Sequence, residues 1–151
     1  MKEANLYTDG ASRGNPGPAG AGFVLTTAHD AVIVQRAIPL GVTTNGVAEY
    51  RALIAGMAEA HSRGITHLRV YSDSEFMVRQ MQGVYKVRTP AIKPLLQWAV
   101  RLRSKFEGFE IQHVPRERNN LADGLAAQGA TLSAAGQCER LGPPTGHDGD
   151  P

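Results

Sequence analysis

The hydrophobic and polar positions along the chain follow two different patterns. Short runs of β-branched, aromatic or alternating residues predict strands over Leu6–Thr8, Ala21–Thr27, Ala31–Leu40, Leu68–Tyr71 and Phe109–Val114. Longer stretches of helix-forming residues predict helices over Val47–Arg63, Ser74–Gln82, Ala91–Phe106 and Asn119–Thr131. In the first of these helices, Tyr50, Leu53 and Met57 recur at three- and four-residue intervals and mark its buried face.

Capping residues support the helix boundaries. Thr44 or Asn45 is a suitable N-cap for the first helix, and Gly64 is a suitable residue to end it. Pro94 belongs in the first turn of the third helix, where no backbone donor is lost.

The order of these elements predicts an α/β fold. The first three strands are joined by short turns, which predicts an antiparallel meander. The later strands follow helical crossovers, and such connections join parallel strands. The full order is β-β-β-α-β-α-α-β-α, so we expect one mixed five-stranded sheet flanked by helices.

The length of 151 residues suits one domain with a tail. We place the domain at residues 1–131. Residues 132–151 are rich in Gly, Pro and small residues without periodicity, which predicts a disordered tail or a linker to another domain.

Composition favours a cytoplasmic protein. The single cysteine, Cys138, rules out an internal disulfide framework and is typical of a reducing compartment. No apolar run approaches the roughly 20 residues that cross a membrane. The N-terminal residues lead directly into a predicted strand, so we expect no signal peptide and no membrane attachment. Nothing in the sequence indicates an obligate protein partner.

The net charge of +2 conceals one strongly basic stretch between Phe76 and Phe106. It contains no acid and seven basic residues, namely Arg79, Lys86, Arg88, Lys93, Arg101, Arg103 and Lys105. A solvated helix face normally mixes both signs. A block of one sign with interleaved Phe76, Tyr85 and Trp98 favours a surface that faces a polyanion.

Four acids have local explanations when each is taken alone. Asp9 before a glycine is typical of a turn, and Asp73 after a strand is typical of an N-cap. Glu49 and Asp123 lie near helix starts, where the helix dipole favours negative charge.

Together the four acids indicate a metal site. Strand ends and helix starts converge at one edge of an α/β sheet, where catalytic sites are commonly found. Carboxylates gathered there would repel one another unless cations bind between them. Carboxylate oxygens are the ligands that Mg²⁺ prefers, and two such ions about 4 Å apart can support phosphodiester hydrolysis.

The glycine-rich segment Gly17–Gly22 has the spacing of a dinucleotide-binding fingerprint, but the context excludes it. That fingerprint needs a helix immediately afterwards. The residues that follow, Phe23–Thr27, predict a strand instead.

Five segments, in order and with matching spacing, resemble type 1 ribonuclease H. They are Tyr7–Ala11, Gly14–Gly20, Thr43–Asn45 with Ala48–Glu49, Ser72–Ser74 and Asn119–Asp123. The resemblance covers residues 4 to 130 and includes all four acids. It implies the RNase H-like fold.

The resemblance also implies an activity: endonucleolytic hydrolysis of the RNA strand of an RNA–DNA hybrid with two Mg²⁺ ions, or Mn²⁺, leaving 5′-phosphate ends. By similarity, Asp9 would bridge both metals, Glu49 and Asp73 would complete one site, and Asp123 would hold the second. The family's substrate-contacting positions correspond to Asn15, Thr44 and Asn45, where contact with a 2′-hydroxyl distinguishes RNA from DNA.

The sequence departs from the family pattern at two places. Many members carry a histidine in the loop before the fourth acid, and here that connection contains Glu117 and Arg118 but no histidine. We expect Arg118, Glu117 or the nearby His113 as auxiliary residues. The connection Tyr85–Pro90 is too short for the basic protrusion of some relatives, and the apolar neighbours of Trp98 predict a core position.

Three alternatives follow from the same sequence. The RNase H-like sheet also occurs in other two-metal nucleases and strand-transfer enzymes, which lack the Asn15 and Thr44–Asn45 features. A non-catalytic nucleic-acid-binding module would be expected to have lost at least one acid. The chain could also be one domain of a bifunctional enzyme.

Overall fold

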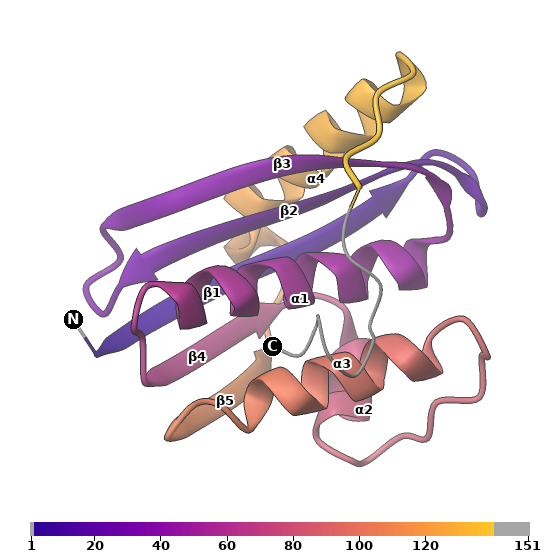
Figure 1. The fold of residues 1–151 in the computed structure, drawn as a ribbon. Helices are drawn as coiled ribbons and strands as arrows, with labels where there is room; N and C mark the ends of the chain where they lie inside the picture. Colours follow the sequence, from indigo (N-terminus) through magenta and orange to yellow (C-terminus); the bar gives the residue numbers. More distant parts are fainter. Residues whose placement is uncertain (1, 141–151) are drawn as a thin grey trace.

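A computed structural model of the chain describes residues 2–140, which form one five-stranded mixed sheet flanked by helices (Figure 1). The strands are β1 (Glu3–Ser12), β2 (Gly17–Thr27), β3 (Val32–Thr43), β4 (His67–Ser72) and β5 (Gly108–His113). Their order across the sheet is β3-β2-β1-β4-β5. The pairs β1–β2 and β2–β3 are antiparallel, and β1–β4 and β4–β5 are parallel. The expected meander and crossovers are therefore confirmed.

The helices lie on both faces of the sheet. They are α1 (Asn45–Ser62), α2 (Glu75–Met81), α3 (Lys93–Arg103) and α4 (Asn120–Ala134), with a short 3₁₀ turn η1 (Arg116–Arg118) before α4. Figure 1 shows α1 on the near face across β1, with α2 and α3 beside it, and α4 behind β2 and β3. The element order is the predicted one, apart from the added 3₁₀ turn.

Helix α1 follows directly from its sequence. Its N-cap is Thr44, whose hydroxyl accepts a hydrogen bond from the N–H of Val47 at 3.3 Å. Leu53 and Met57 are fully buried, and each stabilises the fold by about 1.5–3 kcal/mol on burial. Gly64 follows the helix with φ of +80°, a conformation that favours glycine.

Two glycines let helices approach the sheet where the acids lie. A Cβ on Gly10 of β1 would lie 2.3 Å from the backbone nitrogen of Glu49 in α1. A Cβ on Gly22 of β2 would lie 2.5 Å from the carbonyl oxygen of Ala122 in α4. Both distances are far inside van der Waals contact, so a side chain at either position would push its helix away from Asp9.

The expectations for α3 are confirmed. Trp98 is 8% exposed and belongs to the core, with the Arg51 guanidinium 5.8 Å from its ring centroid. Pro94 is the second residue of α3, inside the first turn. Among residues 2–140 no helix has the length and apolar character needed to span a bilayer.

Regular structure continues past the predicted domain boundary at residue 131. Helix α4 continues to Ala134, and Cys138 forms a β-bridge with Leu40 of the edge strand β3. Next to it, Glu139 makes an ion pair with Arg36 at 2.6 Å. These residues lack periodicity because they pair with a strand edge instead of burying a helical face. The remainder of the predicted tail, residues 141–151, lies outside the described residues.

Candidate active site

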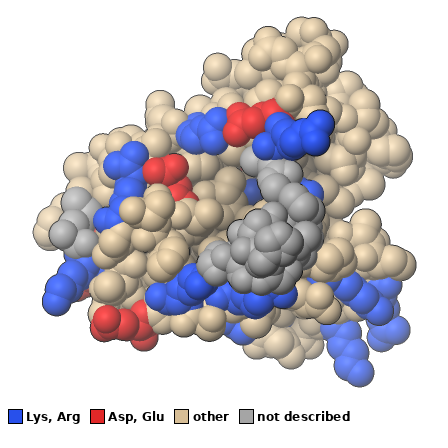
Figure 2. Space-filling view, viewed as in Figure 1, with Lys and Arg blue, Asp and Glu red and all other residues tan. Residues whose placement is uncertain are grey.

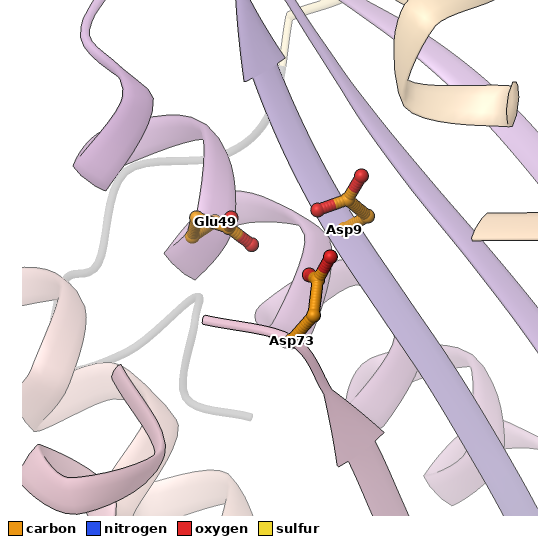
Figure 3. Close-up of side chains that lie close together, drawn as sticks. All are labelled: Asp9, Glu49 and Asp73. Carbon is orange, nitrogen blue, oxygen red and sulfur yellow. The ribbon is translucent and has the colours of Figure 1, made fainter. Parts of the chain in front are cut away.

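Three of the four predicted acids converge at one edge of the sheet. Asp9 lies inside β1, opposite Gly22 of β2, and is 4% exposed, so it is not a turn residue. Asp73 follows the last residue of β4, and Glu49 lies in the second turn of α1. One carboxylate oxygen from each acid lies within 4.8 Å of the others. Figure 3 shows the three side chains pointing toward one another.

The sheet register brings the first two acids together. In the parallel pair of β1 and β4, Thr8 lies opposite Ser72, so Asp9 and Asp73 each follow the last paired residue. Glu49 is tied to the same place because its Oε1 atom accepts a hydrogen bond from the Gly10 N–H at 3.0 Å. Asp73 does not cap α2, because the N-cap of that helix is Ser74.

The proximity of these carboxylates perturbs their ionisation. Burial raises the pKa of Asp9 well above its ordinary value, and the charge of Glu49 and interactions with Asp123 and Asp73 raise it further. Burial and the charge of Asp73 also raise the pKa of Glu49, against the opposing effect of the Gly10 N–H. The cluster therefore strongly disfavours carrying all its negative charges without a compensating cation.

The donor set fits a hard divalent cation. Asp9, Glu49 and Asp73 offer carboxylate oxygens in one place, and a cation between them would offset both the burial cost and the repulsion. A cation of this kind lowers the pKa of a bound water and stabilises negative charge on phosphate oxygens.

Asp123 is not part of this trio, but it interacts with Asp9 and lines the same cavity. The open cavity of about 330 Å³ is lined by all four acids, together with Ser12, Asn45 and Arg116 among others. Asp123 lies in the first turn of α4, and its Oδ1 and Oδ2 atoms are 3.1 and 3.4 Å from Nη2 of Arg116. All four predicted acids therefore line one site.

The predicted substrate-contacting residues lie together at the start of α1, and one of them lines the acid cavity. Asn15 accepts a hydrogen bond from the Asn45 N–H at 3.0 Å, and the Ser12 hydroxyl donates to the Asn45 side chain at 3.2 Å. Thr44 serves as the cap of α1. Only Asn45 of the three predicted residues lines the acid cavity. Contact of any of them with a substrate stays a prediction.

The predicted auxiliary residues lie elsewhere. Glu117 and Arg118 line a second cavity of about 300 Å³, together with Tyr7 and Asp30, and do not line the acid cavity. His113 is exposed at the end of β5.

Sequence reasoning missed Arg116 and Asn119 at the acid site. The 3₁₀ turn η1 decides which residue of the connection faces the acids, and no hydrophobic period marks such a short turn. The only sequence signal for these residues was their place in the connection before Asp123, where the resemblance to ribonuclease H implies a histidine.

A basic groove adjoins the acid site. It has a volume of about 730 Å³, and its lining includes Glu49, Phe76, Tyr85, Lys86 and Arg88. The rings of Phe76 and Tyr85 lie 5.6 Å apart, and Phe76 is 73% exposed. Figure 2 shows Lys and Arg side chains gathered on the side of the molecule where α2 and α3 lie. Part of the predicted basic stretch therefore borders a groove that reaches an acid of the cluster.

Fold and site together define an RNase H-like α/β domain, and comparisons with known proteins agree. A family model described as reverse transcriptase-like matches residues 7–129. A bifunctional protein of Mycobacterium tuberculosis strain H37Rv is 46% identical over 122 residues, which are 80% of this chain and 34% of that protein. A ribonuclease HI of Halobacterium salinarum is 38% identical over 122 residues, covering 81% of this chain and 61% of that protein.

Solved structures extend the comparison. The N-terminal RNase H domain of the mycobacterial protein, fused to maltose-binding protein, aligns with a TM-score of 0.87 and 41% identity over 90% of this chain and 99% of that chain. LC11-RNase H1 in complex with an RNA/DNA hybrid aligns with a TM-score of 0.82 and 37% identity over 87% and 99%. The chain belongs to the ribonuclease HI family. It spans about a third of the length of the mycobacterial relative.

Proposed function

We propose that this chain hydrolyses the RNA strand of RNA–DNA hybrids as an endonuclease with two divalent cations, and leaves 5′-phosphate ends. The observation that carries the proposal is the convergence of Asp9, Glu49 and Asp73 within 4.8 Å, with Asp123 on the same cavity. Carboxylate oxygens are the ligands that Mg²⁺ and Mn²⁺ prefer, and a pair of such ions supports phosphodiester hydrolysis.

The four acids have different roles in this proposal. Asp9 interacts with each of the other three acids, so it is the acid that would contact both cations. Glu49 and Asp73 complete the first site, and Asp123 contributes to the second. The Gly10 N–H holds Glu49 in place, so its carboxylate keeps its orientation before a cation arrives.

Arg116 is the residue that we assign to the place of the family's loop histidine. Its guanidinium pairs with Asp123 and is 74% exposed, so it can exchange Asp123 for a phosphate oxygen without leaving a buried charge behind. Arg118 and Glu117, which the sequence also offers for this role, line the second cavity.

The hybrid is the proposed substrate for two reasons. The relative LC11-RNase H1 was solved with an RNA/DNA hybrid. In this chain, the groove that holds Lys86 and Arg88 begins at Glu49 and offers a cationic path for the second strand. Asn45 lines the acid cavity and is held by Asn15, so this pair is suited to recognise a ribose 2′-hydroxyl.

The mycobacterial relative extends well beyond the segment that this chain matches. The mycobacterial relative carries the name bifunctional protein, so we retain the proposal that this domain works beside a second one. A cytoplasmic location and the absence of an obligate partner stay predictions from the sequence.

The test is cleavage of a hybrid with either strand labelled, with Mg²⁺ and with EDTA, beside an Asp73→Asn variant. We expect Mg²⁺-dependent cutting of the RNA strand alone, 5′-phosphate products, and a loss of several orders of magnitude in the variant. Equal cutting of the DNA strand, or activity in EDTA, would falsify the proposal. Binding without any cleavage would favour the non-catalytic module.

A further inference from the structure

The buried residue Asn119 occupies a helix N-cap position but does not cap the helix. It precedes α4, is 1% exposed, and its side chain makes no capping hydrogen bond. An asparagine in this position ordinarily accepts a bond from the helix backbone, which is worth about 1 kcal/mol. The Asn119 side chain makes no such bond and points toward the sheet instead.

The amide of Asn119 instead contacts the segments that carry two of the acids. Its Nδ2 atom donates to the carbonyl oxygen of Thr8 at 2.8 Å and lies 3.4 Å from Oδ1 of Asp73. Thr8 is the residue before Asp9, and the pairing of β1 with β4 ends at Thr8. The amide thus links the two strands just where their ladder stops.

The backbone of Asn119 contacts the segment of a third acid. Its carbonyl oxygen accepts a hydrogen bond from the N–H of Asp123 at 2.9 Å. One residue therefore contacts the point in β1 where its pairing with β4 ends, the residue just after β4, and the first turn of α4. These three elements hold Asp9, Asp73 and Asp123.

The chemistry of the amide suits this position. Asp73 lies near other carboxylates that repel it, and a donor beside its Oδ1 atom opposes that repulsion. A lysine or arginine would do so more strongly, but its charge would also compete with a cation for the carboxylate. The neutral amide orients Asp73 and leaves its charge available.

We propose that Asn119 is a positioning residue that holds Asp73 beside Asp9 for cation binding. The role in catalysis rests on the proposed function, but the cation-binding role does not need a substrate. Partners that orient metal ligands typically change metal affinity by roughly 10- to 100-fold when removed.

The experiment compares Asn119→Ala with Asn120→Ala, a matched control at the exposed next residue. Calorimetric titration with Mn²⁺ without substrate should show affinity at least about tenfold weaker for Asn119→Ala and unchanged for the control. In hybrid cleavage, the half-saturating Mn²⁺ concentration should rise for Asn119→Ala while the KM for the hybrid stays the same. A purely structural role would lower stability without this selective shift.

Asn119→Leu serves as a second variant, because it keeps a similar side-chain volume and removes the donor. Circular dichroism identifies which variants fold. A folded variant at position 119 with wild-type Mn²⁺ affinity would overturn the inference, and so would loss of folding in both, since Asn119 would then be a scaffold residue. Weakened Mn²⁺ binding in a chain whose wild type cuts no hybrid would instead reject the proposed function alone.

Discussion

Arg116 lies over Asp123, with one guanidinium nitrogen 3.1 Å from one carboxylate oxygen and 3.4 Å from the other. The two residues are seven positions apart and are brought together by the 3₁₀ turn that precedes α4. The guanidinium of Arg116 neutralises the charge of Asp123, so a cation that binds at the site would compete with Arg116 for that carboxylate.

The first prediction concerns competition at Asp123. Arg116→Ala removes a positive charge that faces the acids, so the half-saturating Mg²⁺ concentration in hybrid cleavage should fall by a few-fold, as expected for an exposed ion pair. The effect should shrink as ionic strength rises. Arg118→Ala is the matched control, because Arg118 lines the other cavity. An unchanged Mg²⁺ requirement in Arg116→Ala, or an equal shift in both variants, would contradict the pairing.

The second prediction concerns stability and pH without a cation. The folded-state pKa values of Asp9 and Glu49 lie above their ordinary values of 3.8 and 4.5, so the folded chain retains protons that the unfolded chain has lost. The contribution of these two groups to the free energy of unfolding should be largest below about pH 4 and should be lost as the pH rises through their raised pKa values.

Thermal unfolding in EDTA at about pH 5.5 and about pH 8.5 measures this dependence. Asp9→Asn should unfold at a higher temperature than the wild type at the higher pH, whereas the exposed substitution Glu107→Gln should not. Added Mg²⁺ should reduce the pH dependence of the wild type. A wild-type Tm that rises with pH in EDTA would show that the cluster is not strained by its charge.

The third prediction concerns the close approach of α4 to the sheet. Gly22→Ala places a methyl group 2.5 Å from backbone atoms of Ala122 and Ala126, which cannot move without displacing the helix, so stability should fall by about 2–4 kcal/mol. Gly124→Ala is the control, because Gly124 lies in α4, the helix that Gly22 contacts, and a Cβ there meets nothing within 4 Å. Helix propensity predicts that Gly124→Ala stabilises the fold by up to about 1 kcal/mol. Denaturant unfolding of both variants provides the comparison.

The fourth prediction concerns the basic groove. Replacement of Lys86 and Arg88 by alanine should raise the KM for the hybrid and leave kcat nearly unchanged, because these residues line the groove and not the acid cavity. The slope of log affinity against log salt should become shallower by about 2. The control is Arg63→Ala, at the far end of α1, where Arg63 pairs with Glu59. A kcat effect as large as the KM effect would place the two groove residues in the reaction itself.

The hydrophobic pattern was sufficient to predict the strands and helices and their order along the chain, apart from the 3₁₀ turn η1. Tyr50, Leu53 and Met57 recur at a helical period, and they form the buried face of α1 because a regular helix converts that period directly into one surface. Trp98 was expected in the core for the same reason and is found there. The first strand was predicted as Leu6–Thr8, which is shorter than β1, because Asp9 and Gly10 are residue types typical of a turn. Pairing with β2 on one side extends the strand through both residues.

By itself, the sequence determined the α/β class, the succession of strands and helices, and the identity of the four acids. These follow from local periodicity and from motifs that are contiguous along the chain. Only the tertiary structure decided which residues meet. It brought Asp9 and Asp73 together through the β1–β4 register and placed Glu49 beside them through the approach of α1 to Gly10. It also turned Arg116 and not Arg118 toward Asp123, and directed the Asn119 side chain to Thr8 and Asp73. Contacts between distant segments depend on register and helix approach, and no local pattern records either.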